Sequence, residues 1–374
     1  MLRISHFRFL QRCRRLAASG ALVGVACLVP FADVRAATTP GEGGGPAAIK
    51  SYLLGKLQSM AGAGHDFVSH ADAYQKLVDA SGGDYNRAAL EHGAELQALI
   101  VKMQGDYRVY HNNGYETVEG IVAGTKAMVD FDTYLDAGVP KAEASTDSPY
   151  SPLVLKSRDG KIISDRNGNL FHYIIEPTLW GTKETYLRRL SVEAAASVKP
   201  LTVLPRAEVL TAAAADCARK LDDLLGVATR WQPTLDECVG ALVWMTPTLN
   251  GYFDDWRDSR YNPQASLGRY VAESRVLDMR GIMSSLQIVC NAILPELNKK
   301  DPALAARLKS EYADIMNFIA RVDERERRSG GKITAAQIEE LAHQAKSLTD
   351  QLSPHLRQMA AVLNLHLPPK PTLA

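Results

Sequence analysis

The residues best suited to chemistry are a histidine and a glutamate, His172 and Glu176, which lie four positions apart among large apolar side chains. On a helix, positions i and i+4 share one face, with their Cβ atoms roughly 5–6 Å apart. A buried carboxylate is costly unless a cation, a metal ion or a proton offsets its charge. The pair therefore predicts either a metal site or a core histidine bonded to the nearby glutamate.

Pro177 follows Glu176 directly and bears on this choice. If a helix runs through Pro177, the carbonyl of Tyr173 loses its amide partner and is available to the site. If a helix restarts there, Glu176 becomes its N-cap, which would tie its carboxylate to backbone amides. The sequence leaves both arrangements open.

Other chemically capable side chains give weaker patterns. His65 and His70 are five positions apart and do not share a helical face, so they form a less favoured rival cluster. Trp244, Tyr252 and Trp256 fit core or groove packing better than a ligand platform.

Residues 1–36 are predicted to be a signal peptide. Five arginines up to Arg15 precede an almost wholly apolar run over residues 16–32, and small residues precede a cleavage position after Ala36. The apolar run is too short and too rich in glycine and alanine for a good membrane span. Lipidation at Cys27 and twin-arginine export are less favoured alternatives. We therefore expect a periplasmic or secreted protein.

The remainder of the chain is close to neutral. Removal of the leader takes six arginines and one aspartate from the 43 basic and 42 acidic residues, which leaves a net charge of −4. No basic stripe remains to indicate nucleic-acid binding. The remaining cysteines, Cys217, Cys238 and Cys290, are odd in number and show no C-x-x-C spacing, so we expect buried thiols.

Helical spacing dominates the chain after its leader. Apolar residues recur at three and four positions, and a run with Ile121, Met128 and Leu135 spaced by seven predicts a helix that closes near Gly138. Thr234 with Glu237 predicts a capping box, as does Thr334 with Gln337, and Asp301-Pro302 predicts a further helix start.

Long helices joined by short turns predict an all-α fold of antiparallel helical bundles in two bundle-like halves. Proline, glycine and polar residues predict a long loop or short hairpin near residues 139–170. The expected parts are a flexible lead-in (37–48), an N-terminal helical domain (49–200), a C-terminal helical bundle (201–366) and a tail (367–374).

A longer pattern resembles a known family. The stretch 273–287, followed by Asp301-Pro-Ala-Leu304 and the capped helix at Thr334, resembles the end of the imelysin-like family. These are exported, all-helical proteins named as metallopeptidases, and they include EfeO/EfeM-type periplasmic components of iron uptake. The likeness covers about residues 110–366. The family's Gly-x-His-x-x-Glu signature matches 169–176, although here the histidine and glutamate are four apart, and Leu170 replaces the glycine.

A second match lies upstream. Tyr115-Glu116-Thr-Val-Glu119 resembles the family's Tyr-Glu-x-x-Glu, and the stretch from Phe131 to Asp136 resembles its Asp-rich turn, with glycine at position 138 where an arginine is usual. Two close carboxylates repel unless something positive lies between them. The alternative for Glu116 and Glu119 is a solvated helix start, where acids are favoured.

The resemblance implies a metal site formed by five side chains: Glu116, Glu119, Asp136, His172 and Glu176. Carboxylates with one imidazole suit iron, zinc or calcium better than copper(I). The implied function is a periplasmic metal-binding protein in iron uptake or under iron regulation. Its implied partners are the ion and an inner-membrane iron permease or other uptake components.

Two other functions remain open. A metallopeptidase needs protein ligands, an open position for water and a general base. The sequence pattern offers one histidine where known helix motifs supply two, so binding is favoured over hydrolysis. In the third possibility, a metal-independent helical binding module, His172 and Glu176 only hold the core together.

Overall fold

The computed structural model describes residues 44–138, 152–261 and 273–371. The predicted signal peptide and most of the predicted lead-in lie outside the described residues, as do the last three residues of the tail. Among the described residues, no helix combines the length and the hydrophobicity that crossing a bilayer requires.

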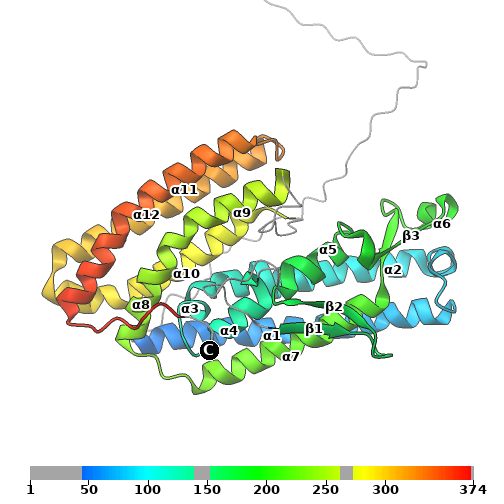
Figure 1. Cartoon of the computed structure of the whole chain (residues 1–374), viewed down its shortest axis with the longest axis horizontal. Helices are drawn as coiled ribbons and strands as arrows, with labels where there is room; N and C mark the ends of the chain where they lie inside the picture. The colour runs from blue at the N-terminus through cyan, green and yellow to red at the C-terminus, as the bar shows by residue number, and fades with distance from the viewer. Residues whose placement is uncertain (1–43, 139–151, 262–272, 372–374) are drawn as a thin grey trace, which may run out of the picture. The chain divides into compact units, whose positions relative to one another are not determined.

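The fold is all-α, as predicted (Figure 1). Each longer helix buries the apolar face that its spacing of three and four predicts. The longer helices are α1 (Pro46–Ala80), α2 (Tyr85–Tyr107), α7 (Ala207–Arg230), α8 (Leu235–Met245), α9 (Leu249–Tyr261), α10 (Arg275–Lys300), α11 (Pro302–Arg328) and α12 (Ala335–Leu363).

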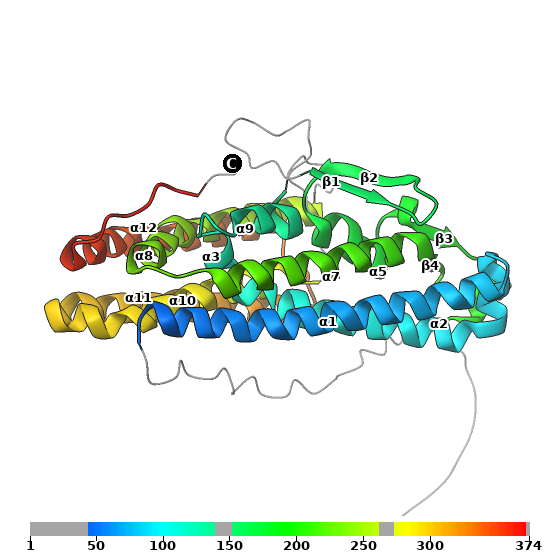
Figure 2. The same cartoon turned by 90° about the horizontal axis from the view of Figure 1, so that it is seen from below.

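The longer helices pack in two groups of neighbours (Figure 2). Helix α1 packs against α2 and α7, while α10 packs against α11, and α12 packs against α9 and α11. The described residues belong to one compact unit. The predicted domain boundary between residues 200 and 201 stays a prediction, and α7 on its C-terminal side packs along α1.

Local sequence signals set several helix ends. Both predicted capping boxes are present, with the Thr234 and Thr334 hydroxyls each accepting the backbone N–H three residues later. Asp301 caps α11 by accepting from the backbone N–H of Leu304 at 2.9 Å. All three cysteines of the described residues are free and buried, as expected.

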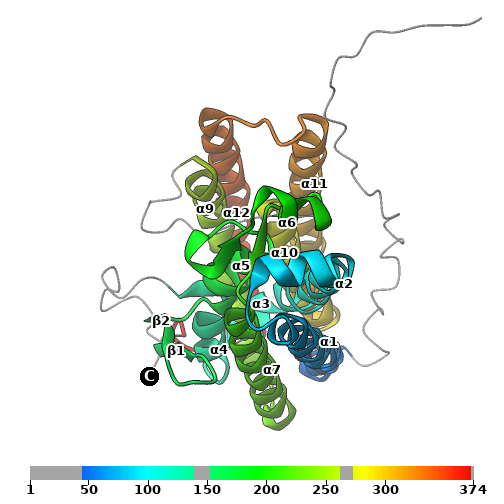
Figure 3. The same ribbon diagram turned by 90° about the vertical axis from the view of Figure 1, so that its right-hand side faces the viewer.

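Two small antiparallel strand pairs complete the described fold. Strands β1 (Pro152–Lys156) and β2 (Ile162–Asn167) form a hairpin beside α7, within the predicted loop or hairpin (Figure 3). Residues 139–151 of that segment lie outside the described residues. Strands β3 (Leu187–Arg189) and β4 (Val203–Pro205) form the second pair.

Short helical pieces connect these elements. They are the π-helical turns η1 (Arg108–Asn112), η3 (Thr133–Ala137) and η5 (Phe171–Ile175), the 3₁₀ turns η2 (Tyr115–Thr117), η6 (Glu184–Tyr186) and η7 (Thr246–Thr248), and the short α-helices α3 (Glu119–Val122), α4 (Val129–Asp132), α5 (Glu176–Leu179) and α6 (Val192–Ser197).

The prediction of one helix through Ile121 and Leu135 is wrong. The chain instead runs through α3, a turn, α4 and η3. In the turn, Gly124 lies so close to α8 that an added Cβ would be 2.5 Å from the Cβ of Ala241. The spacing of seven therefore reflects burial of three separate short pieces rather than one continuous helical face.

Candidate metal centre

Four buried side chains converge in the core: His111, Glu116, Asp136 and His172. One ligand atom from each lies within 4.8 Å of the others, and none of the four residues is more than 1% exposed. His172 Nε2 lies 2.7 Å from Asp136 Oδ1, and His111 Nε2 lies 2.9 Å from Glu116 Oε1. Two imidazoles and two carboxylates so placed could hold a metal ion.

Each of these side chains comes from a short, non-α-helical turn. His111 lies on η1, Asp136 on η3 and His172 on η5, which are all π-helical, while Glu116 lies on the 3₁₀ turn η2. Single π-helical turns are rare and occur frequently at functional sites. The backbone therefore adopts uncommon helical conformations at the place where the four side chains meet.

Two glycines allow these turns to come together. Gly168, at φ +49°, lies so close to η3 that an added Cβ would be 1.9 Å from the carbonyl oxygen of Thr133. The next residue, Asn169, donates its backbone N–H to that oxygen at 3.0 Å. On α10, a Cβ added at Gly281 would lie 2.6 Å from the Cβ of Glu116. Glycine thus brings η5 towards η3 and α10 towards η2.

Glu176 lies behind His172 rather than among the four converging groups. Its Oε2 is 2.9 Å from His172 Nδ1, and its Oε1 accepts the backbone N–H of Glu273 at 3.3 Å. A carboxylate that accepts from Nδ1 fixes the imidazole so that Nε2 can bind an ion. Glu176 is therefore placed to orient the His172 ring.

The structure decides between the two arrangements that Pro177 leaves open. Ile175 and Glu176 both have right-handed helical backbone, so the helix runs through Pro177 and does not restart at a Glu176 cap. The carbonyl of Tyr173 accepts from Lys183 Nζ at 3.4 Å. The Glu176 carboxylate is thus not used as a helix cap.

Glu119 is buried next to the four-residue cluster. Its Oε1 accepts a hydrogen bond from the hydroxyl of Tyr252. The sequence pattern predicts only a packing role for Tyr252. Burial, followed by the negative charges of Glu116 and Asp136, raises the pKa of Glu119 well above its usual range. Glu119 is not among the four residues whose ligand atoms converge, so the structure places it as a neighbour of the cluster.

Arg275 on α10 brings a permanent positive charge to the centre. The residue is 0% exposed, and its Nη1 lies 2.6 Å from Asp278 Oδ2 and 3.1 Å from His172 Nε2. Burial and Glu116 raise the pKa of Asp278 to about 7, despite the opposing effect of Arg275. The guanidinium offsets part of the negative charge in this part of the core.

Buried carboxylates outnumber buried cations in the described residues. The buried acids are Glu116, Glu119, Asp132, Asp136, Glu176 and Asp278, against Arg275 and two histidines. Burial alone would lower the pKa of His111, but Glu116 and Asp136 raise it well above its usual range. The pKa of His172 is likewise raised, because Asp136 and Glu176 outweigh burial. The cluster therefore favours bound positive charge.

Several polar atoms of the cluster lack a hydrogen bond. Within the described residues, no hydrogen bond reaches Nδ1 of His111 or Oε2 of Glu116, while His111 Nε2 and Glu116 Oε1 lie 2.9 Å apart as an ion pair. Buried polar atoms in native proteins are nearly always hydrogen-bonded. An ion held by His111 and Glu116 would supply a partner for one ring nitrogen and for the carboxylate.

Of the five residues predicted from the sequence, Glu116, Asp136 and His172 lie together in the cluster, while Glu119 and Glu176 lie beside it. Sequence reasoning missed His111. One signal pointed to it, because His111 lies four residues after Tyr107 and so continues the buried face of α2.

The rival histidines lie elsewhere. His65 is exposed and pairs with Asp222, with 3.2 Å between Nε2 and Oδ2. His70 pairs with Asp106, with 2.6 Å between Nδ1 and Oδ2. Within the described ranges, each pairs with a carboxylate, and neither belongs to the four-residue cluster.

Comparison of the chain with protein-family models and with curated proteins finds no match. The resemblance to the imelysin-like family therefore stands on the sequence stretches described above.

Proposed function

We propose that this protein is an exported metal-binding protein of iron acquisition that holds its ion with His111, Glu116, Asp136 and His172. The observation that carries the proposal is the meeting of these four buried side chains within 4.8 Å. Glu176 orients His172, and Arg275 balances part of the surrounding charge.

An ion accounts for features that a purely structural network does not. A hydrogen-bonded core pair would leave neither an excess of buried carboxylates nor the unbonded His111 Nδ1 and Glu116 Oε2. It would also not require three π-helical turns to present its members. These features together favour metal binding over a metal-independent module.

The donor set favours iron or zinc. Imidazole suits iron and zinc, whereas calcium takes oxygen ligands and copper(I) prefers sulfur. The imelysin-like resemblance supports iron as the ion, export as the route and an inner-membrane permease as a partner. Zinc is the alternative ion.

The second candidate function is a metallopeptidase. Two histidines with two carboxylates match a zinc donor set better than the single histidine evident from the sequence. However, a hydrolytic site needs an open position for water and access for a peptide. Because the four residues are at most 1% exposed, the observed arrangement favours ion binding over peptide cleavage.

Isothermal titration calorimetry on the chain without residues 1–36 tests the proposal, with iron(II) under anaerobic conditions and zinc and calcium in parallel. We expect one iron or zinc site per chain, with His172→Ala weakening it by about 100-fold or more. His343→Ala is the matched control, because that histidine is exposed, lies outside the four-residue cluster and pairs with Glu339 at 3.8 Å.

Three results would count against the proposal. Metal binding that is absent, or equally strong in the wild type and His172→Ala, removes the ion-binding function. An unchanged melting temperature in the presence of metal would favour the metal-independent module, because an ion that binds the folded state must raise that temperature. Zinc-dependent proteolysis that is lost in Glu176→Gln would favour the peptidase.

A further inference from the structure

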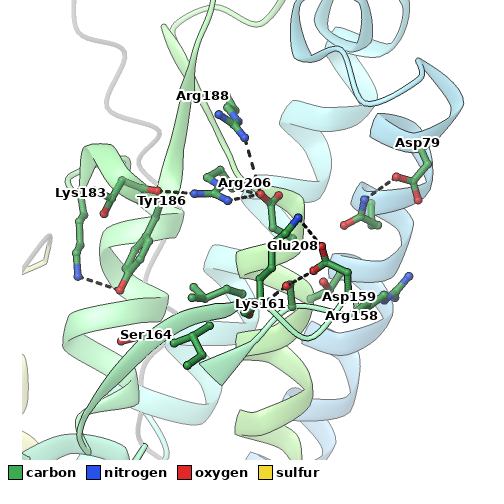
Figure 4. Close-up of a pocket in the computed structure, with 16 residues that line it drawn as sticks. Asp79, Arg158, Asp159, Lys161, Ser164, Lys183, Tyr186, Arg188, Arg206 and Glu208 are labelled. Carbon is green, nitrogen blue, oxygen red and sulfur yellow. Dashed lines mark hydrogen bonds and ion pairs between the residues drawn. The ribbon is translucent and has the colours of Figure 1, made fainter. Parts of the chain in front are cut away.

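A second site candidate lies away from the four-residue cluster, where the β1–β2 turn, η6, β3 and the start of α7 surround a cavity of about 860 Å³ (Figure 4). Ligand-binding cavities typically measure about 300–1,000 Å³. The cavity is therefore large enough for a small organic ligand.

Basic side chains outnumber acidic ones on its walls. Among the described residues that line it, the basic ones are Arg158, Lys161, Lys183, Arg188 and Arg206, and the acidic ones are Asp79, Asp159 and Glu208. Five basic against three acidic side chains give this lining an excess of positive charge, and an excess of one sign attracts ligands of the opposite sign. The cavity therefore favours an anion.

One side of the cavity brings two arginines to a single carboxylate. Arg206 Nε donates to Glu208 Oε1 at 2.7 Å, and Arg188 Nη2 lies 4.0 Å from the same oxygen. Burial opposes ionisation of Glu208, but its hydrogen bonds and these arginines lower its pKa. Since each guanidinium carries five N–H donors, one carboxylate cannot saturate both.

Other cations face the cavity from different elements. Lys161, in the turn between β1 and β2, pairs with Asp159 at 2.7 Å. Lys183, just before η6, donates to the hydroxyl of Tyr186 at 2.9 Å. Figure 4 shows Lys183 and Lys161 on different sides of Arg206. A ligand that satisfies more than one of these sides needs more than one anionic group.

We propose that this cavity binds a small polyanion that carries two or more carboxylate or phosphate groups. Arg188 and Arg206 hold one group through charge-assisted hydrogen bonds, and the lysines on the other walls hold another. The aromatic ring of Tyr186 and the aliphatic side chain of Ile163 form an apolar part of the lining. This site does not depend on the proposed metal function.

Calorimetry with two probes on the metal-free chain without residues 1–36 tests the proposal. Citrate represents the polycarboxylates and pyrophosphate the polyphosphates, while glucose serves as an uncharged ligand of similar size. We expect one saturable site for at least one of the two anions, and none for glucose. Which anion binds more tightly identifies the preferred group.

Two neighbouring arginines on β3 supply a matched pair of variants. Arg188 lines the cavity, whereas Arg189 does not and instead pairs with Glu184 at 3.1 Å on the surface. Arg188→Gln and Arg206→Gln should each weaken anion binding by about tenfold or more, because each removes charge-assisted contacts. Arg189→Gln should leave the affinity within about twofold.

Equal loss in Arg188→Gln and Arg189→Gln would overturn the proposal, because it would indicate diffuse attraction to surface charge. Failure of both anions to saturate the wild type at millimolar concentration would also overturn it. Melting curves test whether each variant is folded, and the half-exposed position of Arg188 should make its replacement mild. The metal-free protein should bind the anion, which separates this test from that of the metal centre.

Discussion

At the scale of single residues, the histidine contacts in the candidate metal centre are of two kinds. His172 Nδ1 meets Glu176, and its Nε2 meets Asp136 and Arg275. The contact with Glu176 orients the ring, while the contacts at Nε2 involve groups that would move if an ion bound there. Arg275 and the proposed ion would both offset the negative charge of the buried carboxylates.

Glu176→Gln tests the orienting role. Glutamine keeps the size of the side chain and an oxygen that can accept from Nδ1, but it loses the charge. We expect metal affinity to fall by about 10- to 100-fold, with little change in fold stability. A complete loss of binding in calorimetry would instead make Glu176 a direct ligand. Exposed Glu184→Gln is the control.

Arg275→Met tests the balancing role. Removal of one partner from a buried ion pair leaves Asp278 uncompensated, which should lower the free energy of unfolding of the metal-free protein by about 3–5 kcal/mol. The same change removes a positive charge near His172, so the affinity for a divalent ion should rise by about tenfold. Urea unfolding and calorimetry measure the two effects. Weaker metal binding in a folded variant would contradict the balancing role.

At the scale of elements, the centre depends on short turns that local sequence rules do not predict. The capping boxes at Thr234 and Thr334 were predictable because side chain and backbone lie within one helical turn. The π-helical turns were not predictable, because packing between distant segments holds them. For the same reason the sequence pattern does not indicate His111, because its turn follows a regular helix and precedes an apparent break.

The resemblance to known motifs did bring out Glu116, Asp136 and His172, which lie far apart in the sequence and meet in the structure. Spacing alone could not separate the residues that converge from those that lie beside them. Glu119 shares the Tyr-Glu-x-x-Glu pattern with Glu116 but is bonded to Tyr252, which follows more than 100 residues later. Only the tertiary fold distinguishes these two roles.

Gly281→Ala tests how closely α10 must approach η2. The added Cβ would lie 2.6 Å from the Cβ of Glu116, so the turn must move. We expect a loss of about 1–3 kcal/mol in the free energy of unfolding, together with weaker metal binding. Gly55→Ala on α1 is the control, since its Cβ would meet nothing within 4 Å. That change should stabilise the helix by about 0.5–1 kcal/mol. If Gly281→Ala bound metal as tightly as the wild type, the close approach of α10 to η2 would not be needed for metal binding.

At the scale of the whole molecule, the fold class followed from helical spacing, and the described residues confirm it. The helices bury a core that contains six carboxylates next to Arg275 and two histidines. Such a core favours positive charge, which protons supply in the metal-free protein and an ion would supply after binding. Stability and metal binding should therefore both depend on pH.

The pH dependence has a definite sign. The pKa values of His111, His172, Glu119 and Asp278 are all raised in the folded protein, so the metal-free folded state binds more protons than the unfolded state. Their stabilising contribution is present below the unfolded pKa values and is lost as pH rises through the folded ones, at about pH 7 for Asp278. Because an ion displaces these protons, the metal-induced rise in melting temperature should be larger near pH 7.5 than near pH 5.5. A larger rise at the lower pH would contradict this linkage.

Anomalous diffraction from crystals of the metal-loaded protein tests the central claim most directly. With data collected at the absorption edge of the bound metal, the account predicts one strong peak in the anomalous difference map. It should lie about 2.0–2.2 Å from ligand atoms of His111, Glu116, Asp136 and His172. A strong peak elsewhere on the chain, or four unmoved side chains with no peak between them, would contradict it.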